Sequence, residues 1–180
     1  DPAAMDYAYE LFASGEDMAM RITDYFGTAT DLEVPAQIGG IPVVAIGPGA
    51  LQGCAGLQAI VLPQSVTSIG ASAFQGCAGL TSVIVPEGVT QIEAYTFAGC
   101  VVLASVALPD GITDVSYNAF EGCPEGLKFY CKLSGTTAGA LGEQGYEFRD
   151  PGHPGYVFKG DPSEQGAVEL LAYEGKGGDL

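Results

Sequence analysis

The chain repeats itself every 23 residues, and this period constrains its fold more than any other feature. Four cysteines, each preceded by glycine, mark the period: Cys54, Cys77, Cys100 and Cys123. A large apolar residue three positions before each cysteine repeats with it: Leu51, Phe74, Phe97 and Phe120. A fixed period of this length indicates stacked supersecondary units, none of which can bury its apolar face alone.

The residues within one unit predict its local structure. Residues 80–85 are β-rich and end at Pro86, which cannot extend a hydrogen-bonded ladder. Residues 89–92 form a second short extended piece, and residues 93–100 are expected to make a helical or 3₁₀ turn with Phe97 packed inside. Equivalent strands of successive coils should lie about 4.8 Å apart.

The repeated aromatic and cysteine positions are expected to form the core: Phe74, Phe97, Phe120, Cys54, Cys77, Cys100 and Cys123. Zinc sites cluster their cysteines within a few residues, whereas here each cysteine stands alone in its coil. Stacked equivalents would also hold their Cβ atoms about 4.8 Å apart, which exceeds the usual separation in a disulfide. We therefore expect reduced cysteines that act as small buried hydrophobic residues, with Cys131 also pointing inward.

Composition and motifs exclude several functional classes. The net charge of −16 repels phosphate backbones and argues against nucleic-acid binding. The single histidine, His153, lies between prolines, so a nucleophile–base pair has little support, and no glycine-rich nucleotide motif is present. We expect no enzyme activity, no cofactor and no metal. The sequence holds no apolar run of the roughly 18 residues that a membrane span needs. Its Asp1-Pro2 start, without Met, suggests a chain that was processed or cut from something longer.

The repeat resembles a known family. Blocks such as Leu80-x-x-Val83-x-Val85-Pro86, Val89-x-x-Ile92 and Thr96-Phe97-x-Gly99-Cys100 recur across residues 28–131. They resemble the BspA-like (Treponema pallidum-type) leucine-rich repeats of bacteria. The resemblance implies a β-rich, right-handed leucine-rich repeat solenoid of about four to five coils with short helical or 3₁₀ turns. It further implies a secreted or cell-surface protein that binds host proteins or other cells, with no shared catalytic residues.

The chain divides into four segments. Residues 1–27 should form a capping β-hairpin, residues 28–135 the repeats, and residues 136–148 a C-terminal cap with a short helix. Residues 149–180 read as a linker followed by a possible second cap, because Tyr173-x-Gly175-x-x-x-Asp179-Leu180 copies Tyr25-x-Gly27-x-x-x-Asp31-Leu32. The segment after the linker would then be the entry hairpin of another repeat block.

The candidate binding surface is the outward face of the repeated strands. A residue flanked by two inward ones must face out, and these positions with their neighbours are Val61, Ser82, Ile84, Ser105, Ala107, Lys128 and Tyr130. An apolar stripe on an open sheet predicts recognition of a protein or glycan partner on a host or another cell. The alternative interpretation is a passive structural spacer in a multidomain surface protein. Tyr95, at a variable position, is a weaker candidate.

Overall fold

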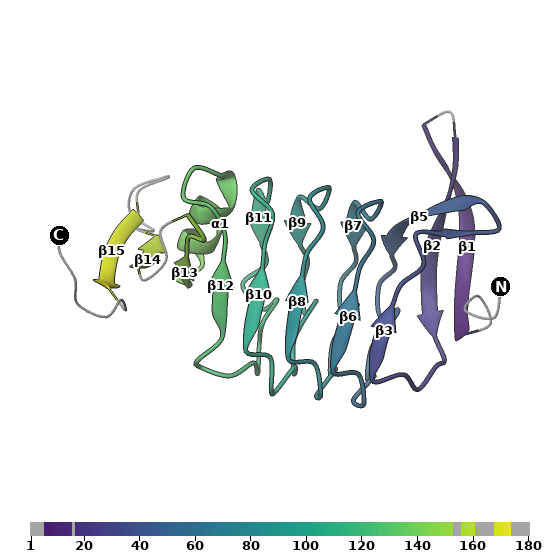
Figure 1. Ribbon diagram of the computed structural model, residues 1–180, viewed down its shortest axis with the longest axis horizontal. Coiled ribbons are helices and arrows are strands. Elements are labelled where there is room, and N and C mark those ends of the chain that lie inside the picture. The colour runs from purple at the N-terminus through teal and green to yellow at the C-terminus, as the bar shows by residue number, and fades with distance from the viewer. Residues whose placement is uncertain (1–5, 16, 153–155, 161–167, 174–180) are drawn as a thin grey trace.

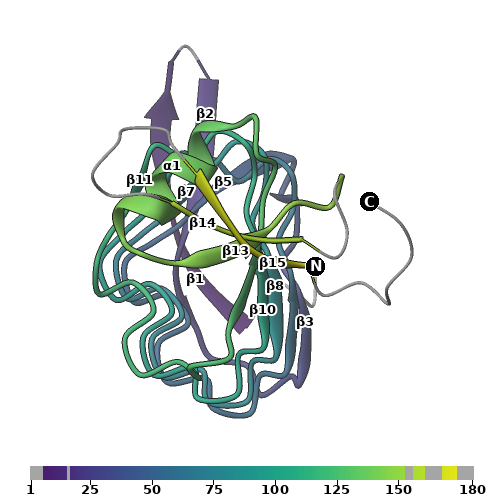
Figure 2. The ribbon, with the colours of Figure 1, turned by 90° about the vertical axis from the view of Figure 1, so that its left-hand side faces the viewer.

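Stacked coils form an elongated solenoid, with the N-terminal hairpin at one end and the C-terminal strands at the other (Figure 1). The computed structural model describes residues 6–15, 17–152, 156–160 and 168–173. Viewed along its long axis, successive coils superimpose on one outline (Figure 2). The 23-residue period therefore corresponds to one coil.

One row of parallel strands runs along the whole solenoid. It takes one three-residue strand from each coil: β3 (Asp31–Glu33), β6 (Ala59–Val61), β8 (Ser82–Ile84), β10 (Ser105–Ala107), β12 (Lys128–Tyr130) and β13 (Glu147–Arg149). Partners lie 23 residues apart in the regular coils, as Val83 and Val106 do. Over the described residues the row holds six parallel strands. The expected four to five coils were therefore one or two too few, because the first and last strands lie in units with irregular sequence.

A second row, of one six-residue strand and three two-residue strands, lies on another side of the coil (Figure 2). Its members are β5 (Ile41–Ile46), β7 (Ser68–Ile69), β9 (Gln91–Ile92) and β11 (Asp114–Val115). Parallel pairs β5–β7 and β9–β11 keep the same one-coil register. Each of the three short strands ends on a buried apolar residue, which anchors this side of the coil to the core.

The core is built from columns of equivalent side chains. The rings of Phe74, Phe97 and Phe120 stack nearly parallel, with centroids 5.3 and 5.5 Å apart. Phe74 and Phe97 are fully buried, whereas Phe120 is 5% exposed. Offset stacking of this kind adds about 0.5–1.5 kcal/mol per pair to the free energy of burial. The phenylalanine column thus links neighbouring coils directly.

The segment before each cysteine forms consecutive turns rather than a helix. Hydrogen bonds of the 3₁₀ type are present, from Ala98 N to Tyr95 O and from Cys100 N to Phe97 O. A continuous helix is interrupted because Ser72 and Tyr95, one period apart, adopt positive φ angles of 59° and 58°. The expected helical or 3₁₀ turns are therefore present only as isolated hydrogen bonds.

A β-hairpin closes the N-terminal end. Strands β1 (Tyr7–Ser14) and β2 (Asp17–Tyr25) pair antiparallel, and β2 continues the second row by pairing parallel to β5. Strand β4 (Gln37–Ile38) pairs with the start of β5 in a small hairpin, turned by Gly39 and Gly40 at φ 59° and 82°. Two successive glycines with positive φ are typical of a two-residue hairpin turn.

The C-terminal end is closed by a helix and an antiparallel extension. Helix α1 (Thr136–Glu143) falls in the segment where a short helix was expected. The Thr137 hydroxyl is buried, donates to Pro109 O and accepts from Ile112 N, which ties α1 to the last regular coil. Strands β14 (Tyr156–Gly160) and β15 (Val168–Tyr173) then extend the main sheet antiparallel to β13. Within the segment read as a linker, Asp150 is buried and accepts from Leu133 N and Gly152 N, so this part is anchored.

Candidate functional site

The outward positions of the main sheet form a continuous column. Parallel pairing places Ala107 beside Ile84 on one side and beside Tyr130 on the other. The same register puts Val61 beside Glu33 of the first strand. Because parallel strands in register align equivalent side chains, this column runs along the solenoid face from coil to coil.

Exposure within the column is greatest at its two β-branched residues. Ile84 is 70% exposed and Val61 is 59% exposed, while Ala107 and Tyr130 are half-buried. In the neighbouring column Ser82 and Lys128 are exposed and Ser105 is half-buried. Two large apolar side chains on adjacent strands thus face solvent, and packing of the core does not explain why they are apolar.

Charged residues bracket the apolar column. Glu33 aligns with Val61 at the first strand, and Arg149 aligns with Tyr130 at the last. Glu33 and Arg149 thus place opposite charges at the two ends of the column. These two residues were missing from the sequence prediction. The sequence could have indicated them, because both residues occupy the repeat position of Ile84 in the irregular first and last units.

Other exposed apolar residues lie outside the sheet face. Val101 and Val102 are 56% and 47% exposed in the turn after Cys100, and Tyr117 is 78% exposed. Tyr95 is 39% exposed. These residues stand at variable positions of the repeat, so periodicity alone does not single them out.

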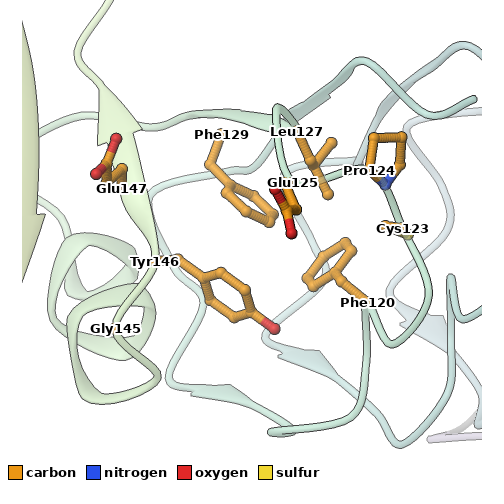
Figure 3. A pocket seen from close by; sticks show the side chains of 9 residues that line it. All are labelled: Phe120, Cys123, Pro124, Glu125, Leu127, Phe129, Gly145, Tyr146 and Glu147. Atoms are coloured by element: carbon orange, nitrogen blue, oxygen red, sulfur yellow. The ribbon is translucent and has the colours of Figure 1, made fainter.

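A pocket of about 400 Å³ lies where the last regular coil meets the C-terminal cap (Figure 3). Phe120, Phe129 and Tyr146 contact one another beside it, with centroid distances of 4.8, 5.7 and 4.9 Å. Glu125 and Glu147 also line it. The phenylalanine column ends here, because residue 143, the next position of the period, is a glutamate in α1. Phe120 packs edge to face on the other two rings, and Phe129 and Tyr146 are tilted by 49°, so these three rings leave no parallel pair between which a flat ligand could stack.

The four repeat cysteines are equivalent positions of successive coils, and Cys131 lies apart from them, directly after β12. All five are free; Cys77, Cys100 and Cys131 are buried, whereas Cys54 and Cys123, at the two ends of the repeat column, are only half-buried. The latter two therefore depart from the expected full burial, because each lies beside an irregular unit. Cys77 Sγ donates to Leu51 O at 3.2 Å, and Cys100 Sγ donates to Phe74 O at 3.3 Å. Each thiol thus connects its coil to the preceding one.

These thiols are poor nucleophiles. Burial raises the pKa of Cys77, Cys100 and Cys131 to about 12, and that of Cys123 to about 11. The thiolate is the reactive and metal-binding form, and at neutral pH these groups stay protonated. In the part of the chain that the structure describes, no three His, Cys, Asp or Glu side chains come together as a metal site would require. Within the same residues, no helix has the length and apolar composition for crossing a bilayer.

Comparison with known proteins identifies the repeat. The model of the BspA type leucine-rich repeat region matches residues 41–139 in six copies, which is more than half of the chain. None of the curated proteins compared matches the chain.

Solved structures share the architecture. A T. pallidum leucine-rich repeat protein is 25% identical, with a TM-score of 0.58 over 72% of this chain and 71% of that protein. A leucine-rich repeat protein from Bacteroides ovatus is 27% identical, with a TM-score of 0.57 over 69% of this chain and 35% of that protein. One from Bacteroides capillosus, 23% identical with a TM-score of 0.59, covers 69% of this chain and 94% of that protein and shows the fold alone. Such solenoids are typically non-catalytic interaction or structural modules. Because the family model matches more than half of the chain in six copies, the chain belongs to the BspA-type leucine-rich repeat family.

Proposed function

We propose that this chain is a non-catalytic binding module of a secreted or cell-surface bacterial protein. Its partner is a protein on a host or on another cell, held against the outward face of the main sheet. The observation that carries the proposal is the exposure of Ile84, at 70%, beside Val61, at 59%. Bacterial proteins with BspA-type repeats are often found at the surface or secreted, which supports the location.

The chemistry of the face favours a protein over a glycan. Its most exposed members are branched aliphatic side chains, which match the apolar centre of a protein–protein contact. The one aromatic ring of the proposed surface, Tyr130, is half-buried, so little of it is open for a sugar to stack on. Ser82 and Lys128 beside the column supply polar groups for the rim of such a contact.

A charge placed in the column tests the proposal. Ile84→Lys should leave the free energy of unfolding within about 0.5 kcal/mol, because the side chain is already in solvent. It should weaken binding about tenfold or more, since it buries a charge at the centre of the contact. Binding is measured by biolayer interferometry against immobilised extracellular-matrix proteins and, separately, mucin-type glycans. The matched control is Val101→Lys, which is 56% exposed but lies off the sheet, and it should bind normally.

Three outcomes contradict the proposal. Equal binding by the Ile84→Lys variant to a verified partner would place the site elsewhere, with the surface around Tyr95 the next to test. Binding only to glycans would replace the protein partner with a carbohydrate. The absence of binding across both panels would favour a structural spacer.

A further inference from the structure

The two ends of the chain carry hairpins with the same register. In β1–β2, Tyr7 opposes Tyr25, and the pairing shifts by one residue between Ala8 and Tyr9. In β14–β15, Tyr156 opposes Tyr173, and the pairing shifts between Val157 and Phe158. The irregularity lies at the same distance from the tyrosine pair in both hairpins. Strand β14 is therefore the positional equivalent of β1, and Phe158 is the equivalent of Tyr9.

The structure shows what covers the second hairpin. Strand β13 pairs with the outer edge of β14, with Phe148 opposite Phe158 and Glu147 opposite Lys159. Phe158 is 9% exposed and stacks on Phe148 with centroids 5.9 Å apart. Helix α1 also packs against β14. The C-terminal end of one repeat block thus buries the core-facing side of a following hairpin.

The first hairpin presents the same side to solvent. Strand β1 is at the edge of its sheet in the described structure, at the opposite end of the molecule from β15 (Figure 1). Tyr9 is 43% exposed and Leu11 is 52% exposed. Their cross-strand partners Ile22 and Met20, on the same face, are 0% and 5% exposed. The apolar face therefore continues past the end of the core, onto a strand that pairs only with β2 among the described residues.

We propose that β1 is the docking edge for a second repeat block of this same kind. The helix and last strand of that block, equivalents of α1 and β13, would cover Tyr9 and Leu11 and pair antiparallel with β1. This surface is distinct from the sheet face of the proposed binding function. The β1 edge would join repeat blocks end to end. A longer solenoid would then contain a hairpin at each junction between blocks, instead of an unbroken run of coils.

Charge at the junction makes the proposal specific. Glu10 opposes Arg21 in the first hairpin, and Lys159 opposes Glu169 at the equivalent place in the second. The charge order is thus reversed. If this chain preceded a copy of itself, Glu147 would face Glu10 instead of Lys159, and like charges directly opposite are unfavourable. A preferred preceding block carries a basic or neutral residue where this chain has Glu147.

A tandem protein tests the junction. Residues 1–155 are joined directly to residues 7–180, so that β1 of the second block replaces β14 of the first and the whole chain from Tyr7 onward follows. Hydrogen–deuterium exchange is measured at the β1 amides that do not bond to β2. These amides should exchange at least about tenfold more slowly in the tandem than in the single chain, because a ladder partner protects them. Exchanging the charges of the second block (Glu10→Lys with Arg21→Glu) should slow them by a further two- to five-fold, roughly.

The control changes the apolar face alone. Tyr9→Lys with Leu11→Lys in the second block should return β1 exchange to the rate of the single chain. The same pair of substitutions in the single chain should leave its unfolding midpoint nearly unchanged, which shows that the hairpin still folds. Unaltered β1 exchange in the tandem, with two blocks that unfold independently, would overturn the proposal. Protection that survives the lysine substitutions would also overturn it.

Discussion

Truncation of the central ring in the phenylalanine column offers the sharpest test of how the coils are held together. Phe97 is fully buried and stacks on both neighbours, Phe74 and Phe120. Replacing a buried phenylalanine by alanine costs about 3–5 kcal/mol. Two ring pairs are lost here, each worth about 0.5–1.5 kcal/mol beyond burial, so Phe97→Ala belongs at the upper end, at about 4–5 kcal/mol. A domain of this size has about 5–15 kcal/mol of stability, and the variant should lose a large share of it.

The measurement is urea unfolding followed by circular dichroism, with midpoint and slope compared. Phe97→Leu is the matched variant, because Leu51 occupies the equivalent position two coils earlier. It keeps much of the volume and should cost only about 1–2 kcal/mol. Val101→Ala, at an exposed position, should change stability by less than about 0.5 kcal/mol. If the alanine and leucine variants are equally stable, or alanine costs less than about 1 kcal/mol, the ring does not couple the coils as argued.

Three further predictions concern the thiols and two backbone positions. The pKa values of Cys77 and Cys100, raised to about 12 by burial, exceed that of an unfolded thiol, so the folded state holds more protons above pH 9. The stability that the protonated thiols provide is fully present below pH 9 and falls as the pH rises toward 12, by up to about 1.4 kcal/mol per pH unit for each thiol. Between pH 8.5 and 10.5 the urea midpoint should therefore fall less in the variant with both Cys77→Ala and Cys100→Ala than in the unchanged protein. Equal falls in the two proteins would contradict the raised pKa values. Gly99→Ala should lower the free energy of unfolding by about 1–2 kcal/mol, because the φ angle of Gly99 is 73°. The control is Gly111→Ala, at a position with open space and no positive φ, which should leave the free energy of unfolding unchanged. Equal losses in the two variants would exclude backbone strain at Gly99 as the cause. Tyr95→Asn should raise the free energy of unfolding by up to about 1 kcal/mol, because asparagine tolerates the left-handed region better than tyrosine does. A lower free energy of unfolding would show that the tyrosine ring stabilises the fold by more than its backbone conformation costs.

The sequence predicted the parts of the fold that the period dictates. Strands at Ser82–Ile84 and Ser105–Ala107 fall where alternation placed them, because a strand with one buried face has a strict two-residue pattern. The turn at Gly39 and Gly40 carried its own signal, because a pair of glycines favours a two-residue hairpin turn. The left-handed backbone at Tyr95 carried no signal, because packing of the coil overrides the local preference of a tyrosine.

The candidate site was predictable to a similar extent. Outward orientation of Val61 and Ile84 followed from alternation, but their degree of exposure depends on what neighbouring coils cover. Only one part of the structural role of the cysteines could be predicted from the sequence. Repetition indicated burial, whereas the donation from Cys100 Sγ to Phe74 O depends on the distance between coils, which residue types alone do not encode.

The parallel ladders also set how the molecule responds to force. Their hydrogen bonds, such as those from Val85 N to Ala107 O and from Ala104 N to Thr81 O, point from one coil to the next along the long axis. Tension applied between the two ends therefore opens these bonds a few at a time, rather than shearing a whole ladder at once. Each coil that detaches releases 23 residues, or about 75–80 Å of extended chain. The solenoid should therefore lengthen under load in even steps, one coil at a time.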